Sequence, residues 1–181
     1  INTTNTGTIT VSNAIDINGS GSEVAAAFAA IDNNTGNATA NITGNDYTVA
    51  QLKAINAATD GAIVLVVPNV DFTDSSSNLA AAFDGTINSS GTLTVNNNDY
   101  TVAELKKINT GTSGDIVLNN AGVAISGTVA NIKAAFAGTV TEHTGTVTIS
   151  DANTVNITAT DITSINTTNT GTITVSNAID I

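Results

Sequence analysis

The segment at residues 1–17, INTTNTGTITVSNAIDI, returns letter for letter at residues 165–181. The two copies begin at residues 1 and 165, so the chain repeats with a period of 164 residues. Chance does not produce an identity of this length. Self-similarity at a fixed period is the sequence signature of repeat architectures, and it constrains the fold more than any other feature of the chain.

A shorter repeat lies inside this period. The motifs VAAAF, LAAAF and IKAAF each end on a phenylalanine, at Phe28, Phe83 and Phe136. The segment NDYTVAQLKAIN at 45–56 returns as NDYTVAELKKIN at 98–109. We therefore expect 1–181 to form one continuous domain with a period of 164, whose internal units span approximately 7–60, 61–113 and 114–170.

Each unit divides again into two segments, which makes six segments of about 27 residues per period. A glycine starts each segment, and apolar residues alternate after it, which predicts a half-buried strand. In GTITV, for example, Ile9 and Val11 share one face while Thr8 and Thr10 share the other. The same inward pair is expected at Ala38/Ala40, Ile63/Leu65, Leu93/Val95, Ile116/Leu118 and Val147/Ile149.

An Asn- and Asp-rich turn and a second short strand are expected next, at AIDI, DYTV, NVDF, DYTV, VAIS and VNIT. A helix then follows. The pairs Ser20/Glu23, Thr48/Gln51 and Thr101/Glu104 have the spacing of a capping box, in which side chains bond the first free amides of a helix. Apolar residues continue after them at helical spacing.

These elements predict a repeat solenoid: a right-handed parallel β-solenoid with a short helix per coil. Its β-β-α coils would have about 27 residues each, six per period of 164 residues. The alternative is three compact βαβ-like domains of about 55 residues. We disfavour it because domains of roughly 60 residues are marginally stable alone, and no linker separates the units.

The composition excludes several classes of function. The net charge is −11, with four lysines and no arginine, so the chain lacks the basic surface that nucleic-acid binding needs. No apolar run is long enough for membrane insertion. Cysteine and methionine are absent, which suits an oxidising, extracellular setting. Only 10% of the residues are charged, so hydroxyl and amide groups dominate the expected surface.

No arrangement of residues predicts catalysis. His143 is the single histidine, in TVTEHTG, beside Glu142. No further residue accompanies this pair at the spacing of a triad or a metal site. We interpret His143 as a solvent-exposed loop residue, and we expect the protein not to be an enzyme and to need no cofactor.

Two groups of residues remain as candidate sites. Aspartates recur near the predicted turns, and their oxygens are weak candidates for Ca²⁺ binding, with local turn hydrogen bonding as the simpler interpretation: Asp16, Asp46, Asp71, Asp99 and Asp151. The runs AIVLVV and DIVL carry valines on the outward face as well, which is typical of a strand covered on both sides. We therefore expect Val64, Val66 and Val117 to form a lateral interface, covered by another part of the protein or by another copy.

Taken together, repeats such as GTLTVNNNDYTVAELKKIN and TGTVTISDANTVNITATDITSIN resemble the tandem-repeat regions of giant bacterial cell-surface and adhesin-like proteins, including cyanobacterial ones. The resemblance implies an extracellular, cell-surface location and a structural role. We expect a segment of a long surface fibre, sheath or S-layer-like array. Its partner would be the protein itself, end to end and laterally. The alternative is an adhesin that recognises a glycan or a surface, with Ca²⁺ as a possible requirement.

Overall fold

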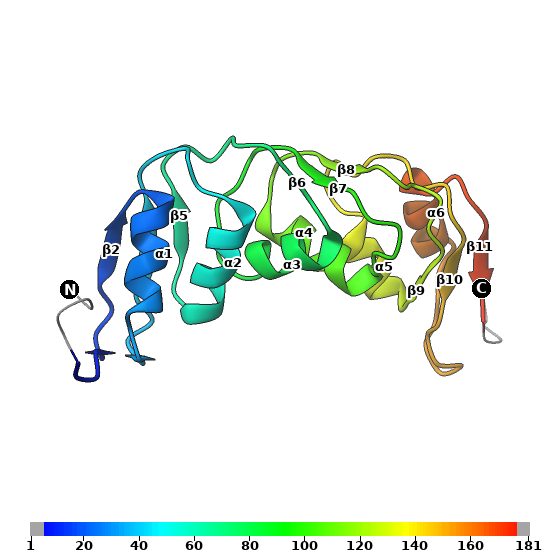
Figure 1. Cartoon of the computed structure of the whole chain (residues 1–181). Helices are drawn as coiled ribbons and strands as arrows, with labels where there is room; N and C mark the ends of the chain where they lie inside the picture. Colours follow the sequence, from blue (N-terminus) through cyan, green and yellow to red (C-terminus); the bar gives the residue numbers. More distant parts are fainter. Residues whose placement is uncertain (1–5, 177–181) are drawn as a thin grey trace.

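The computed structural model describes residues 6–176. Six helices in this range follow one another in chain order (Figure 1). They are α1 (Gly21–Ala29), α2 (Val49–Ala58), α3 (Ser76–Phe83), α4 (Val102–Gly111), α5 (Val129–Ala135) and α6 (Ala159–Thr168). Each helix packs against the next one in the chain, from α1 against α2 to α5 against α6.

The helices begin where the capping residues predict. Capping boxes at Ser20, Thr48 and Thr101 start α1, α2 and α4, so these three predictions are confirmed. A fourth box starts α6, where Thr158 and Asp161 bond each other's backbone amides. Each box satisfies two amides that a helix end would otherwise leave without a partner, which stabilises helices too short to form alone.

Polar side chains connect successive helices. Lysine Nζ atoms donate to an oxygen on the following helix in three places: Lys53 to Asn78, Lys106 to Asn131 and Lys133 to Asp161. The amides of Asn56 and Asn109 donate to the backbone oxygens of Ala81 and Ala134, which also lie on the next helix. The repeat in the sequence thus becomes a repeat of contacts about 25 residues apart.

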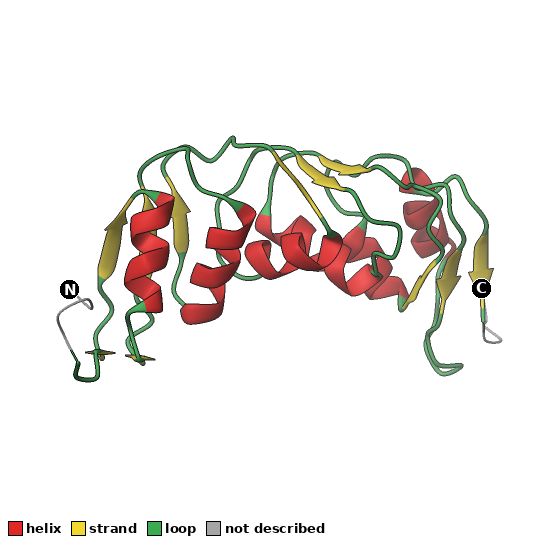
Figure 2. Ribbon diagram, in the orientation of Figure 1, coloured by secondary structure: helices red, strands yellow, loops and turns green. Residues whose placement is uncertain are grey.

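The strands are short, and in Figure 2 long loops separate them. They are β1 (Thr10–Val11), β2 (Asp16–Gly19), β3 (Asn33–Asn34), β4 (Thr39–Ile42), β5 (Ile63–Leu65), β6 (Phe72–Asp74), β7 (Leu93–Val95), β8 (Ile116–Leu118), β9 (Ile125–Gly127), β10 (Val147–Ile149) and β11 (Ile173–Val175). Every pair among these described strands is parallel, as expected for strands joined through helices.

The prediction of a β-solenoid is wrong. The described residues form an α/β fold with four separate parallel sheets, β1-β3, β2-β4-β5, β6-β7-β8 and β11-β10-β9, rather than one ladder along the molecule. β5 and β6, for example, follow each other in the chain but belong to different sheets. The connecting segment there contains Pro68, which has no N–H to donate to a ladder and whose carbonyl instead accepts from the amides of Ser90 and Gly91.

Several predicted second strands are also absent. Both DYTV segments, at 46–49 and 99–102, lead directly into the caps of α2 and α4 without forming a strand, and VNIT at 155–158 does the same before α6. The tyrosines in the first two segments, Tyr47 and Tyr100, are buried, so their apolar rings explain the alternation that suggested a strand. The prediction therefore interpreted a single buried tyrosine before a helix as part of a strand.

The predicted inward pairs do line the core. From Ala38/Ala40 to Val147/Ile149 their members are at most 6% exposed, and Ile9 and Val11 are half-buried. The helices contribute Val24, Leu52 and Leu105 to the same continuous cluster. One apolar core therefore joins all six helices to the four sheets within the described residues.

Candidate functional site

The two copies of the repeated segment lie at opposite ends of the described structure. The first copy contains β1 and leads into β2, and the second contains β11 (Figure 1). The structure describes residues 6–12 and their counterparts 170–176, while Ile1–Asn5 and Asn177–Ile181 lie outside the described residues. The same side chains can therefore be compared in two environments.

The first copy uses one backbone edge. The carbonyl of Ile9 accepts from the amides of Asp32 and Asn33, at 3.0 and 3.2 Å, and the carbonyl of Val11 accepts from Thr35 and Gly36, at 2.9 and 3.0 Å. The amide of Ile9 donates to the Asp32 carboxylate at 2.8 Å. This edge pairs with β3 and the residues that flank it, which come later in the chain.

The second copy uses the other edge. The carbonyl of Thr172 accepts from the amide of Val147 at 2.9 Å, and the amide of Ser176 donates to Ile149 at 3.0 Å. These bonds attach β11 to β10, and β11 is the edge strand of its sheet among the described residues. The same sequence thus pairs in two ways: the second copy bonds β10, which precedes it in the chain, and the first copy bonds Asp32–Gly36, which follow it.

An exposed edge strand is a template for pairing with another chain. Backbone groups in a parallel strand alternate between its two edges. Since Thr172 and Ser176 point toward β10, the backbone of Ile173 and Val175 faces the outer edge of the sheet. These two residues are the counterparts of Ile9 and Val11, which bond the Asp32–Gly36 segment in the first copy. One end of the described structure thus carries the outer edge of β11. The opposite end carries Asp32–Gly36, the segment that pairs with the same sequence in the first copy.

The sequence did not single out Asp32, although it is central to this contact. Its side chain accepts the Ile9 amide and its backbone amide donates to the Ile9 carbonyl. No motif surrounds it, and only the register of β1 against β3 gives it this place.

The predicted lateral surface is partly exposed. Val64 is 37% and Val66 is 59% exposed. Val117 is half-buried, opposite Thr94 in the register of β7 and β8. The structure places Val64 in β5 and Val117 in β8, which belong to different sheets, and Val66 just after the end of β5.

The candidate Ca²⁺ ligands lie apart from one another. Asp71 accepts the amide of Thr92 at 2.7 Å, and Asp99 accepts a hydrogen bond from the side chain of Asn97. Asp16 and Asp46 are exposed in β2 and in the turn before α2. Within residues 6–176, no three Asp, Glu, His or Cys side chains gather where they could hold a metal ion.

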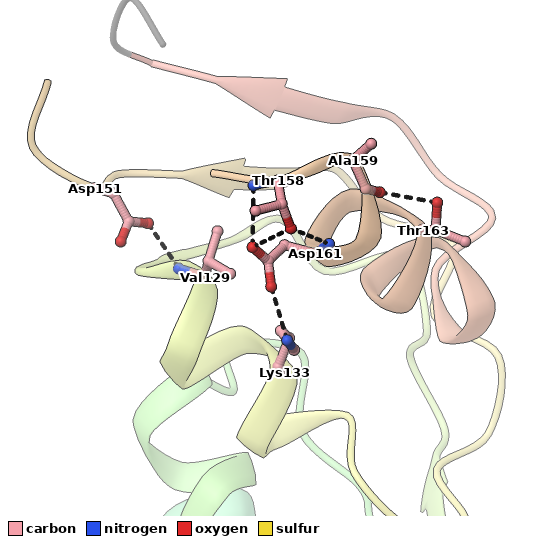
Figure 3. A network of polar contacts seen from close by, with 7 residues as sticks. All are labelled: Val129, Lys133, Asp151, Thr158, Ala159, Asp161 and Thr163. Carbon is pink, nitrogen blue, oxygen red and sulfur yellow. Dashed lines mark hydrogen bonds and ion pairs between the residues drawn. The ribbon is translucent and has the colours of Figure 1, made fainter. Parts of the chain in front are cut away.

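Asp151 is the buried member of this group. It is 8% exposed, and its Oδ2 accepts the amide of Val129, the first residue of α5, at 2.7 Å (Figure 3). The carboxylate therefore interacts with the amino end of a helix, where a negative charge is stabilised.

Figure 3 also shows how α5 and α6 are joined. Lys133 Nζ lies 2.7 Å from Asp161 Oδ1, while the second oxygen of Asp161 accepts from the amide and hydroxyl of Thr158. The hydrogen bond from Lys133, followed by those from Thr158, lowers the pKa of Asp161 to about 2. This carboxylate combines a helix cap with a bond to the preceding helix.

The interpretation of His143 as a solvent-exposed loop residue is wrong, because its side chain is 0% exposed. Its Nδ1 lies 2.6 Å from Asn169 Oδ1, and its Nε2 lies 2.8 Å from the carbonyl oxygen of Val123. The amide nitrogen of Asn169 donates to Gly171, which orients its oxygen toward the ring. Both ring nitrogens thus face acceptors.

The surroundings of His143 are aromatic. Its ring centroid lies 6.2 Å from that of Tyr100 and 5.4 Å from that of Phe136. Burial raises the pKa of Tyr100 to about 12. The polar contacts to Asn169 and Val123 and the packing against two aromatic rings hold the His143 side chain in the core.

No protein-family model matches the chain, and no curated protein or solved structure was found to be similar to it. Among residues 6–176, no helix is both long and apolar enough to cross a membrane.

Proposed function

We propose that the protein is a structural module of an extracellular, cell-surface assembly, such as a fibre, a sheath or an S-layer-like array, and that copies of the module associate end to end. The resemblance of its repeats to those of giant bacterial surface proteins supports the location. Only 10% of the residues are charged, so the surface that neighbouring copies would share consists mainly of hydroxyl and amide groups.

One observation carries this proposal. The two ends of the described structure present the same sequence with opposite edges paired: β11 toward β10, and residues 7–11 toward Asp32–Gly36. A head-to-tail contact between two different surfaces does not close on itself unless a rotation brings the ends together, so it generates rings or open filaments. A module with these ends is suited to a linear assembly.

The alternative is a binding module of the adhesin type, which recognises a glycan, with or without Ca²⁺. Two hollows lined in part by polar side chains lie beside Asp84 and favour this alternative. One, of about 320 Å³, is lined by Asp60, Asp84 and Thr86, and the other, of about 340 Å³, by Asp84, Lys106 and Asn131. Carboxylate, amide and hydroxyl groups are the usual partners of sugar hydroxyls.

Electron microscopy of the concentrated protein, together with a glycan array in Ca²⁺ and in EDTA, tests the two functions. Linear particles of constant width without glycan binding are the expected result. Discrete single particles that bind a defined glycan would contradict the structural function and favour the adhesin.

A further inference from the structure

We infer that two copies of this chain associate by exchanging the repeated segment: residues 170–176 of one copy occupy the place that residues 6–12 hold in a second copy, against its Asp32–Gly36 edge. The inference rests on the proposed function and names the contact through which the copies would join.

Sequence identity is the first argument. Residues 170–176 read TGTITVS, as do residues 6–12, so they carry the backbone groups of Ile9 and Val11 that are hydrogen-bonded to Asp32–Gly36. The carbonyls of Ile173 and Val175 would accept from the amides that Ile9 and Val11 now serve. The amide of Ile173 would donate to the Asp32 carboxylate, as the amide of Ile9 does. No new type of contact has to form.

The free edge is the second argument. Pairing with β10 uses the other side of β11, through Thr172 and Ser176. Segment 170–176 can therefore pair on both sides at once. Residues 6–12 of the second copy would leave their place, and the incoming segment would form the same hydrogen bonds there that the departing one breaks. The exchange is a form of domain swapping, in which an identical element is traded between copies at low cost.

Exposed apolar residues at the two ends supply the third argument. Ile15, which follows residues 6–12, is 44% exposed, and Val155, in the loop between β10 and α6, is 42% exposed. They are two of the four large apolar side chains exposed among the described residues. An exchange brings the end that carries Val155 against the end that carries Ile15. Burial of these side chains would favour association, while the backbone hydrogen bonds formed and broken are the same.

The verbatim repeat provides a matched pair of variants. Proline has no N–H, so Ile9→Pro removes the bond to Asp32 within one copy and weakens the hold on its own residues 6–12. Ile173→Pro removes the same donor from the incoming segment. It leaves the bonds of Thr172 and Ser176 to β10 intact, and proline is tolerated in an edge strand whose N–H faces outward.

The expected effects have opposite signs. Loss of one hydrogen bond to a carboxylate changes an equilibrium by about tenfold. Sedimentation velocity over a range of concentrations should therefore show that Ile9→Pro lowers the concentration at which chain 1–181 associates by about tenfold, while Ile173→Pro raises it by about the same factor. Association that changes in the same direction in both variants would overturn the exchange and would leave end-to-end association as such in place. A chain that stays monomeric in all three forms would overturn both.

A disulfide trap locates the contact. Thr10 and Asn33 are register partners in β1 and β3, and both are exposed. Neighbouring strands place such partners at a distance that a disulfide can span. The chain has no cysteine, so a Thr174→Cys chain mixed with an Asn33→Cys chain under oxidised glutathione should give a mixed dimer. A Thr174→Cys chain mixed with an Asn119→Cys chain is the control. A yield no greater than that of the control would overturn the assigned contact.

Discussion

A substitution of His143 tests how the repeat fills its core. Two aromatic clusters occupy equivalent places, one between the first and second units and the other between the second and third. In one, Phe72 lies between Tyr47 and Phe83, with ring centroids 5.6 and 5.9 Å away. In the other, His143 lies between Tyr100 and Phe136, at 6.2 and 5.4 Å. The central ring comes from a different strand segment in each unit.

In each unit, the position that holds the central ring in the other unit is occupied by a smaller residue. Ile125 starts β9 opposite Val147, as Phe72 starts β6 opposite Leu93. Ser89 forms a parallel bridge to Thr112 at the position where His143 bridges Asn169. The pair Phe72 and Ser89 in one unit thus corresponds to Ile125 and His143 in the next. A large residue and a small one have changed places, which preserves the volume of a close-packed core.

The single variant His143→Ser should lower the free energy of unfolding by about 3 to 5 kcal/mol, since it removes a fully buried ring together with its polar contacts to Asn169 and Val123. The single variant Ile125→Phe should cost about 1 to 3 kcal/mol through overpacking. The double variant restores the arrangement of the second unit. It should therefore be more stable than the sum of the two costs predicts, by about 2 kcal/mol.

Urea unfolding followed by far-ultraviolet circular dichroism measures the three free energies, provided that the slopes of the transitions agree. The hydrogen bonds of His143 are not restored in the double variant, so full recovery is not expected. Additive costs, within about 0.5 kcal/mol, would show that the two positions do not share one space and would refute the equivalence of the clusters.

Other predictions concern pH, packing and the lateral surface. The pKa of Asp161 is lowered from 3.8 to about 2, so its contribution to stability is present above pH 3.8 and is lost as the pH falls through about 2. Asp161→Asn should therefore be less stable than the parent chain at neutral pH and equally stable near pH 2, as thermal melts at each pH would show; a constant difference would contradict this. Gly91→Ala should cost about 1 to 3 kcal/mol in urea unfolding, because a Cβ at this position would overlap the carbonyl oxygen of Val70. Gly122→Ala is the control, with nothing nearer than 3.7 Å, and equal costs would refute the reasoning. Val66→Asp should weaken lateral association, measured by light scattering, without a change in melting temperature, because Val66 is 59% exposed; unchanged association would exclude Val66 from an interface.

The sequence predicted the helices well because their signals are local. Thr48/Gln51 and Thr101/Glu104 satisfy amides within one turn, so the sequence spacing alone determines the contact. The inward apolar pairs were also predictable, since alternation reports a buried face wherever the strand lies.

The sheets were not predictable from the same signals. Which strand pairs with which depends on register between segments more than 20 residues apart, as for Thr10 with Asn33 and for Phe72 with Leu93. A regular repeat suggested one continuous ladder, but strands of two to four residues separated by loops form four short sheets instead. Alternation in the DYTV segments reported a buried tyrosine rather than a strand.

The candidate site was also predictable only where its signal is local in the sequence. The verbatim repeat was visible in the sequence, but its unused edge was not, because the direction of each carbonyl follows from pairing with β10 or β3. His143 looked like a loop residue since TVTEHTG is polar. Its burial depends on Val123 and Asn169, which lie 20 and 26 residues away in the chain.

The mass distribution of the purified chain as a function of concentration tests the central claim most directly. A head-to-tail contact between different surfaces predicts an open series. Mass photometry or light scattering should therefore find particles at successive multiples of 18.0 kDa, with longer members more abundant as the concentration rises. A single mass of 18.0 kDa at every concentration, or a series that stops at the dimer, would contradict end-to-end assembly through the repeated segment.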